Sequence, residues 1–392
     1  MNKCFTAILL AMTASGYGQS LQPAPKLVVN ITIDQLRTDY IEAFSPLYGQ
    51  NGFKKLLSEG RVYEAASYDF APVDRASAVA SVSTGTTPYY NNIVGTQWLD
   101  RSSLRPVFCV DDAKYSTSPG RLSTSTIGDE LKVATNGSSL VYALASARDA
   151  AVLSAGHAAD GAVWIDDKKG TLATTDYYPA KVRKWLDAYN AVYSQRATDD
   201  RTKNLAVAHA AEACVAENAL GRDAHTDYLA VTLSAKGRNA TNWQTDMEGV
   251  YTKLDTLLAS LIGGIEKQVG KQNVLFMVTS TGYTDEENVD YSKYRIPTGT
   301  FYINRTANLL NIYLGAVYGQ GKYVETCFHN EIYLNHKLIE QKRLSLSEVL
   351  GRCQEFLIQN SGVRDVYTTD RLLSGNADVR KLRNGHHPAV SG

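Results

Sequence analysis

The first residue that could do chemistry is Asp34, an acid at the end of the apolar run Leu27–Asp34. Five of the eight residues in this run are β-branched, which predicts a strand buried on both faces of a parallel sheet. Ligands of an open α/β sheet gather outside the carboxyl ends of its strands, so a carboxylate there suits a metal or phosphate site. Asp34 could equally cap the turn into the next helix. Both interpretations stay open at this point.

The composition excludes several classes of partner. The chain has 392 residues, with 40 Lys and Arg against 40 Asp and Glu, so its formal net charge is zero. This balance gives no electrostatic reason to expect binding to nucleic acid or to an anionic membrane. The 24 tyrosines offer amphipathic contact area, which is compatible with protein or glycan partners.

The first 18 residues have the pattern of a signal peptide. Lys3 is followed by the short apolar run Phe5–Met12 and by Gly16-Tyr17-Gly18, a small-x-small cleavage site. The run is too short to span a bilayer, so no transmembrane segment is expected after cleavage. We therefore expect an exported protein, in the periplasm or on the outer-membrane surface of a Gram-negative bacterium. Both a natural end at Gly392 and a longer natural chain stay open at this point.

The spacing of apolar residues predicts an α/β chain. Tyr228–Ser234 and Asn273–Thr279 have the pattern of buried strands, and the amphipathic stretch Met247–Val269 between them predicts a helix. This order is typical of a right-handed crossover unit in a parallel sheet. The small residues Ala76–Ser83 predict a helix packed tightly against that sheet.

Further strands are expected at Val62–Tyr68, Leu140–Leu144 and Val152–His157. The fold class is thus an α/β/α sandwich with a mostly parallel central sheet. We expect residues 19–392 to form a single domain, with an inserted cap roughly within residues 100–225.

Several motifs resemble those of the bacterial alkaline phosphatases in the phosphodiesterase/nucleotide pyrophosphatase branch of the alkaline phosphatase superfamily. They are Val28–Tyr40, Gly52–Gly60, Ser83–Pro88, Ile93–Gly95, Thr126–Leu131, Ala155–Asp160 and Arg383–Gly385. The resemblance covers nearly the whole mature chain in order. It implies an alkaline-phosphatase-like fold with the active site at the carboxyl edge of the sheet.

The resemblance also implies a chemistry. Members of the family hydrolyse phosphate esters with two zinc ions, held by Asp and His, and with a Thr or Ser nucleophile. The metals stabilise the attacking and the leaving oxygen, and cationic or amide groups hold the other phosphate oxygens.

At the matching positions this chain keeps Asp34 but departs from the family elsewhere. The nucleophile position, thirteen residues before Pro88, is Arg75, and a guanidinium cannot be deprotonated in proteins to attack phosphorus. Asp74 and Ser77 are close by, but neither is in register with the motif.

The other family positions hold residues that cannot play the family's roles. The phosphate-binding Asn is replaced by Thr96, and the Lys-x-Arg pair by Ala147 and Asp149, an acid that would repel a phosphate dianion. Four zinc-ligand positions fall on Gly237, Thr241, Thr281 and Gly282. Asp34 alone cannot hold zinc, which needs three or four ligands.

These departures predict a pseudoenzyme with no cofactor and no catalytic residue. We expect a catalytically inactive member of the family that serves as a scaffold or subunit of a protein assembly in the bacterial cell envelope, such as an outer-membrane complex. The alternative is a phosphomonoesterase, a phosphodiesterase or a phosphate-ligand-binding protein with a reorganised site. One further hypothesis is that Arg75 neutralises Asp34 through charge-assisted hydrogen bonds.

Overall fold

The chain was analysed as a computed structural model, which describes residues 24–193, 196–238, 242–283, 295, 301–360, 363 and 365–374. The expected signal peptide and the chain end at Gly392 lie outside the described residues. In the part that is described, no helix is long and apolar enough to cross a membrane.

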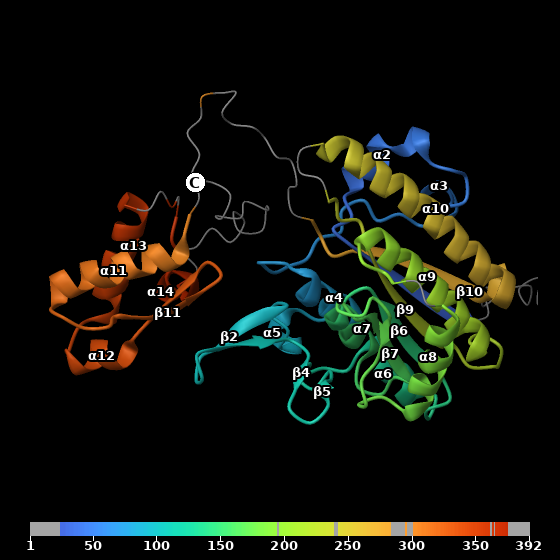
Figure 1. The fold of residues 1–392 in the computed structure, drawn as a ribbon, viewed down its shortest axis with the longest axis horizontal. Helices are drawn as coiled ribbons and strands as arrows, with labels where there is room; N and C mark the ends of the chain where they lie inside the picture. The colour runs from blue at the N-terminus through green and yellow to red at the C-terminus, as the bar shows by residue number, and fades with distance from the viewer. Residues whose placement is uncertain are drawn as a thin grey trace, which may run out of the picture.

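A six-stranded sheet forms the centre of the larger group of elements (Figure 1). In spatial order its strands are β10 (Val274–Ser280), β1 (Leu27–Asp34), β9 (Asp227–Ser234), β6 (Val141–Ala145), β7 (Gly161–Ile165) and β8 (Leu172–Ala173). Neighbouring strands are parallel except β8, which runs antiparallel to β7. This confirms the expected α/β fold with a mostly parallel central sheet.

Helices cover both faces of this sheet. The elements of the larger group outside the sheet are α2 (Thr38–Ala43), η1 (Ser45–Leu47), α3 (Phe53–Glu59), α4 (Arg75–Thr84), α5 (Pro88–Asn91), α6 (Ile127–Ala134), α7 (Arg148–Ala155), α8 (Ala180–Val192), α9 (Asp200–Glu217), α10 (Trp243–Val269) and η2 (Lys271–Asn273). The connection β6–α7–β7 moves along the sheet in one direction and β9–α10–β10 in the other. Because such crossovers are right-handed, α7 and α10 lie on opposite faces. Helix α9 packs beside α10, and α4 packs against α7.

Two short antiparallel hairpins follow α5. They are β2 (Gln97–Asp100) with β3 (Arg105–Phe108), and β4 (Asp111–Asp112) with β5 (Ser116–Thr117). The predicted single domain with a cap insertion within residues 100–225 stays a prediction.

The C-terminal elements form a second hydrophobic cluster of their own, around the buried side chains of Leu310, Leu314, Tyr323 and Val349. Figure 1 draws them as a smaller group beside the larger one. They are α11 (Ile303–Tyr318), β11 (Val324–Phe328), β12 (Glu331–Leu334), α12 (His336–Gln341), α13 (Leu346–Asn360) and α14 (Thr369–Leu373). Cys109, Cys214, Cys327 and Cys353 are free thiols.

Two predicted strands are wrong. Residues 62–68 contain no strand, and Val152–His157 lies mostly in helix α7, whose residues from Asp149 to Ala155 are all buried. A short run of small apolar residues fits a buried helix as well as a buried strand, so its periodicity does not separate the two. The predicted helix at Ala76–Ser83 is confirmed as α4.

The side chain of Asn204 holds the C-terminal end of β9, at the carboxyl edge of the sheet, through two hydrogen bonds. Its side chain, from α9, donates to the carbonyl oxygen of Ser234 at 2.7 Å and accepts from the Ser234 amide at 2.8 Å. Both residues are buried. The paired amide thus satisfies two backbone groups that the sheet leaves without a strand partner.

We predict that Asn204→Ala lowers the free energy of unfolding by about 1–3 kcal/mol, because two buried backbone groups lose their partner. Urea unfolding followed by circular dichroism measures this change. Gln244→Ala, at an exposed position of α10, is the control and should change the free energy of unfolding by less than about 0.5 kcal/mol. Equal stability of Asn204→Ala and the wild type would contradict the assignment.

Candidate functional site at the carboxyl edge of the sheet

The parallel register of three strands brings the candidate residues together. Asp34 at the end of β1 lies opposite Ser234 of β9, and Ile33 lies opposite Ser280 of β10. Thr281 follows β10 directly, so its side chain reaches the same edge as Asp34. This is the edge at which the sequence placed the site.

Thr281 and Asp34 form a buried hydroxyl–carboxylate pair. Thr281 Oγ1 donates to Asp34 Oδ1 at 2.7 Å and accepts from the backbone amide of Gln35 at 3.2 Å. Asp34 is 8% exposed and Thr281 is 3% exposed. Burial raises the pKa of Asp34, against the opposing effects of the Thr281 hydrogen bond and of the Arg75 charge.

Arg75 approaches this pair from the first turn of α4, but its hydrogen bonds go elsewhere. Its Nε and Nη2 atoms each donate to one oxygen of Asp149, both at 2.9 Å. Its Nη1 lies 3.7 Å from Asp34 Oδ2, which makes an ion pair. The hypothesis that Arg75 neutralises Asp34 by charge-assisted hydrogen bonds is therefore corrected: Asp149 accepts those bonds, and Asp34 feels the charge at a longer distance.

Asp149 is the residue of this site whose partner the sequence analysis did not predict. It belongs to α7 and is 1% exposed, so a bidentate guanidinium is the partner that its charge requires. Burial lowers the pKa of Arg75, but the charges of Asp149 and Asp34 and the hydrogen bonds to Asp149 outweigh burial and raise it. The sequence did contain a signal for this pair. At two positions of one family site, the chain replaces the family residues with a cation, Arg75, and an anion, Asp149.

Asp74 and Ser77 are occupied in capping α4. Ser77 N donates to Asp74 Oδ1 at 2.9 Å, and Asp74 N donates to Ser77 Oγ at 3.0 Å, the two bonds of a capping box. The other oxygen of Asp74 accepts from the backbone amide of Thr96 at 2.5 Å. Thr96 is thereby tied to the N-terminus of α4, next to Arg75.

Two of the remaining predicted positions, Gly237 and Gly282, are glycines and offer no side chain to the site. Gly237 lies after β9, and Gly282 has a positive φ of 82° and donates its amide to Ser280 Oγ at 3.0 Å. Thr241 lies outside the described residues. The structure thus brings Asp34, Arg75 and Thr281 together, with Thr96 beside them.

Lys236 was not singled out from the sequence. It is exposed, two residues beyond β9, and its charge lowers the pKa of Asp34 as one of the smaller contributions. Among the described residues, Arg75 and Lys236 are the basic side chains whose charges act on Asp34 of the Thr281–Asp34 pair.

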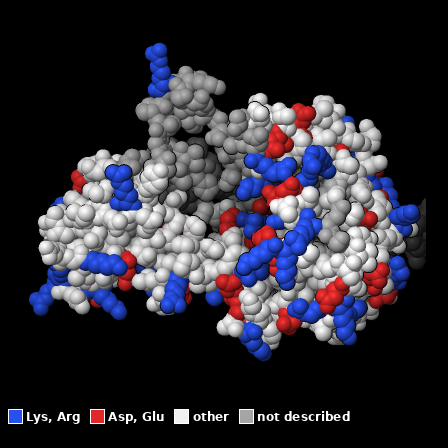
Figure 2. All heavy atoms as spheres, viewed as in Figure 1, with Lys and Arg blue, Asp and Glu red and all other residues white. Residues whose placement is uncertain are grey.

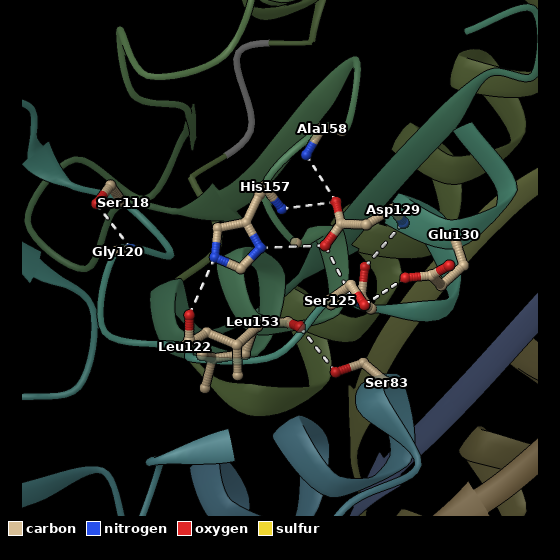
Figure 3. A network of polar contacts seen from close by, with 12 residues as sticks. Ser83, Ser118, Gly120, Leu122, Ser125, Asp129, Glu130, Leu153, His157 and Ala158 are labelled. Carbon is tan, nitrogen blue, oxygen red and sulfur yellow. Dashed lines mark hydrogen bonds and ion pairs between the residues drawn. The ribbon is translucent and has the colours of Figure 1, made fainter. Parts of the chain in front are cut away.

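His157, which the sequence placed in a family motif, belongs to a separate polar network (Figure 3). Its Nδ1 lies 3.1 Å from Asp129 Oδ2 and its Nε2 lies 3.1 Å from the carbonyl oxygen of Leu122. Asp129 also accepts from the amides of His157 and Ala158, and from that of Thr126 in the capping box of α6. The network joins α6 to the segment after α7, so the geometry gives His157 a structural role.

The comparisons with known proteins now decide the family. A family model described as type I phosphodiesterase / nucleotide pyrophosphatase matches residues 28–377. The chain belongs to this family. It is 26% identical over 418 residues to alkaline phosphatase PafA of Elizabethkingia meningoseptica, covering 89% of this chain and 76% of the relative.

Two further comparisons agree. The chain is 25% identical to alkaline phosphatase PhoV of Synechococcus elongatus, covering 94% of this chain and 79% of the relative. The crystal structure of wild-type PafA matches with a TM-score of 0.80 at 25% identity, over 94% of this chain and 84% of that one. The alkaline-phosphatase-like fold implied by the resemblance is thus confirmed.

These findings overturn the predicted function. The expectation of a catalytically inactive scaffold in an outer-membrane complex is wrong, because the relatives that match most of the chain are named alkaline phosphatases. The family and these relatives are phosphoric ester hydrolases. The expectation that the chain uses no cofactor is also corrected, since membership of this family points to metal use.

The described residues nevertheless do not fit the two-zinc site that the resemblance implies. Asp34 Oδ1 accepts from Thr281, and Asp34 Oδ2 faces the Arg75 guanidinium, so both oxygens lie beside hydrogen-bonding or cationic groups of the chain. Among the residues that the structure describes, no group of three or more His, Cys, Asp or Glu is placed to hold a metal ion. No chemical step is therefore derived through a metal.

The Arg75–Asp149 pair generates a prediction about stability. Arg75→Ala should lower the free energy of unfolding by about 2–3 kcal/mol, because it leaves a buried carboxylate unpaired; the partial exposure of Arg75 keeps the loss below that of a fully buried pair. Asp149→Ala should also destabilise, and the double variant should recover part of the loss. Urea unfolding of the four proteins gives the coupling energy, expected at about 1–3 kcal/mol. Additive losses would show that the two side chains do not interact.

The His157–Asp129 pair generates a prediction about pH. The hydrogen bond to Asp129 raises the pKa of His157, against the opposing effect of burial. Burial raises the pKa of Asp129, but its hydrogen bonds from His157, Thr126 and Ala158 outweigh this and hold it low. The stability contributed by His157 is therefore complete below its unfolded-state pKa and is lost as pH rises through its higher folded-state pKa. The stability contributed by Asp129 behaves in the opposite way and is lost as pH falls through its lowered folded-state pKa.

We expect the difference in unfolding free energy between wild type and His157→Asn to be largest in mildly acidic solution and to shrink as pH rises above about 6.5, the ordinary pKa of histidine. Thermal unfolding between pH 5 and 9 measures it. His225→Asn, at an exposed position, is the control. A difference that is constant over this range would mean that His157 is neutral in the folded protein.

Proposed function

We propose that the protein hydrolyses phosphoric esters at the carboxyl edge of β1, β9 and β10, with a site reorganised around Asp34, Thr281 and Arg75. The observation that carries the proposal is the 2.7 Å hydrogen bond from the Thr281 hydroxyl to the buried Asp34 carboxylate, beside a guanidinium. A hydroxyl with an adjacent base is the arrangement of an activated nucleophile. The family relationship supports the same reaction class.

The raised pKa of Asp34 favours its role as the base. In the proposed reaction Thr281 Oγ1 attacks phosphorus and its proton passes to Asp34. The ester P–O bond breaks, and the leaving alcohol oxygen takes that proton. Asp34 then accepts a proton from a water molecule that attacks the phosphothreonine, and Thr281 Oγ1 leaves and takes the proton back.

The two basic groups of the edge hold the phosphoryl oxygens. Arg75 is fixed by Asp149 and keeps Nη1 on the side of Asp34, while its side chain is 32% exposed. Lys236 adds a second positive charge. Such fixed charges stabilise the negative charge that develops in the transition state.

The space beside Thr281 suits this use. A Cβ built on the neighbouring Gly282 would meet only Val73 Cγ1, at 4.0 Å, among the described atoms. Glycine at this position thus adds no side chain next to Thr281, which is itself 3% exposed. Export of the chain to the periplasm or the outer-membrane surface belongs to the same proposal and rests on the N-terminal targeting pattern. Protein partners there are also part of the proposal, and the 24 tyrosines are compatible with them.

The proposal predicts that Thr281→Ala lowers turnover of a chromogenic phosphomonoester or phosphodiester by about 10²-fold or more, since it removes the attacking oxygen. Thr281→Ser should retain a measurable part of the activity because it keeps the hydroxyl. Thr252→Ala, at an exposed hydroxyl of α10, is the control and should match wild type. Initial rates of the purified full chain measure all three.

The assays are run with and without added Zn²⁺, together with metal analysis of the purified protein. The proposal is wrong if wild-type protein neither turns over esters nor binds inorganic phosphate in any of these conditions. It is also wrong if Thr281→Ala is as active as wild type, because another group must then attack phosphorus.

A further inference from the structure

A groove of about 850 Å³ lies between helices α9 and α10. The two helices pack side by side over one face of the sheet (Figure 1). The groove reaches the carboxyl edge of the sheet, because Ser234 and Lys236 are among its lining residues. Of its lining residues, the proposed reaction uses Lys236.

The groove has an apolar floor. Its apolar lining side chains are Leu205, Ala208, Val250, Leu254 and Leu257. Leu205 is 50% exposed, while Leu254 and Leu257 are buried against the core. A half-exposed leucine beside buried apolar side chains favours a ligand that also has apolar surface.

The end of the groove nearest the sheet edge is charged. Lys236, Arg238 and Arg201 lie there with Asp200 and Asp246. Arg238 is held by Asp199 through an ion pair of 2.6 Å and donates its amide to Asp246. Figure 2 shows basic side chains interspersed with acidic ones on this view of the larger group of elements, so no surface of a single sign is formed.

The groove adjoins the candidate site at the carboxyl end of β9. Ser234, a lining residue, is the register partner of Asp34 across the β1–β9 pair. Lys236, also a lining residue, acts electrostatically on Asp34. A molecule with its phosphoryl group at Arg75 and Lys236 would therefore meet the groove with the part that extends beyond the phosphate.

We infer that this groove holds the alcohol part of the substrate, and that the substrate class is phosphoric monoesters of extended apolar alcohols. The inference rests on the proposed function and adds the substrate preference. The apolar floor suits an alkyl or aryl group. The basic side chains at the end of the groove nearest the sheet edge suit one phosphate group. Asp200 and Asp246 beside them disfavour further negative charges, as in a polyphosphate chain.

Alkyl phosphates of different length test this inference. Complete burial of one methylene is worth about 0.8 kcal/mol, or roughly fourfold in affinity. Because the groove is open on one side, we expect hexyl phosphate to bind the full-length protein roughly tenfold to a hundredfold more tightly than ethyl phosphate. Isothermal titration calorimetry of the full-length Thr281→Ala variant, which lacks the proposed nucleophile and so leaves the esters intact, measures both, with inorganic phosphate as the reference for the phosphoryl site.

Two substitutions locate the apolar contact. Leu205→Glu on α9 and Val250→Asp on α10 place a charge on the floor and should reduce the preference for hexyl over ethyl phosphate to less than about threefold. Leu309→Glu, at an exposed leucine of α11 that does not line the groove, is the matched control and should keep the preference. Circular dichroism verifies that each variant is folded.

The outcomes separate this inference from the proposed function. If inorganic phosphate binds but the two esters bind alike, the inference is wrong and the phosphate site stands. If hexyl phosphate is preferred and both floor variants keep that preference, the alkyl group binds elsewhere and the inference is wrong. If phosphate and both esters fail to bind, the proposed function falls and this inference falls with it.

Discussion

The site depends on one electrostatic constraint, which is the presence of two carboxylates that are nearly excluded from water. Asp34 ends the central strand β1 and Asp149 lies in the first turn of α7, and both are buried. A buried charge without a partner is costly, so the chain must supply a cation or hydrogen-bond donors at this edge. Arg75 gives its hydrogen bonds to Asp149 and its longer-range charge to Asp34, and Thr281 gives Asp34 a hydrogen bond.

Arg75 contacts both acids, but it contacts them unequally. A bidentate guanidinium satisfies Asp149 completely, whereas Asp34 has a single hydroxyl donor and a cation at 3.7 Å. Burial therefore outweighs these contacts for Asp34 and raises its pKa. A buried carboxylate with a raised pKa beside a hydroxyl is the environment expected of a general base.

Much of the fold could be predicted because the strands carry strong local signals. Leu27–Asp34, Tyr228–Ser234 and Asn273–Thr279 are apolar and bounded by turns, and they became β1, β9 and β10 with the expected parallel pairing. The segment at Val152–His157 was misassigned because its small apolar residues suit both a strand and a buried helix. The position of Asp34 could be predicted for the same reason as β1. The pairing of Arg75 with Asp149 was missed because each replacement was judged alone, although the resemblance placed both residues in one site; the packing of α4 on α7 brings them together across 74 residues of sequence.

The error about function has a physical origin that is distinct from these. Each replaced residue was judged by the role that the family gives to its position, and Arg75 cannot be the nucleophile that the family uses at that place. A reaction, however, requires a nucleophile, a base and stabilisation of developing charge, and none of these is bound to one position in the sequence. Thr281 stands where the resemblance implies a metal ligand, yet its hydroxyl donates to a buried carboxylate beside a guanidinium. Loss of the family's ligands therefore measures how far the site has changed, while what the site can do follows from the contacts that its present residues make with one another.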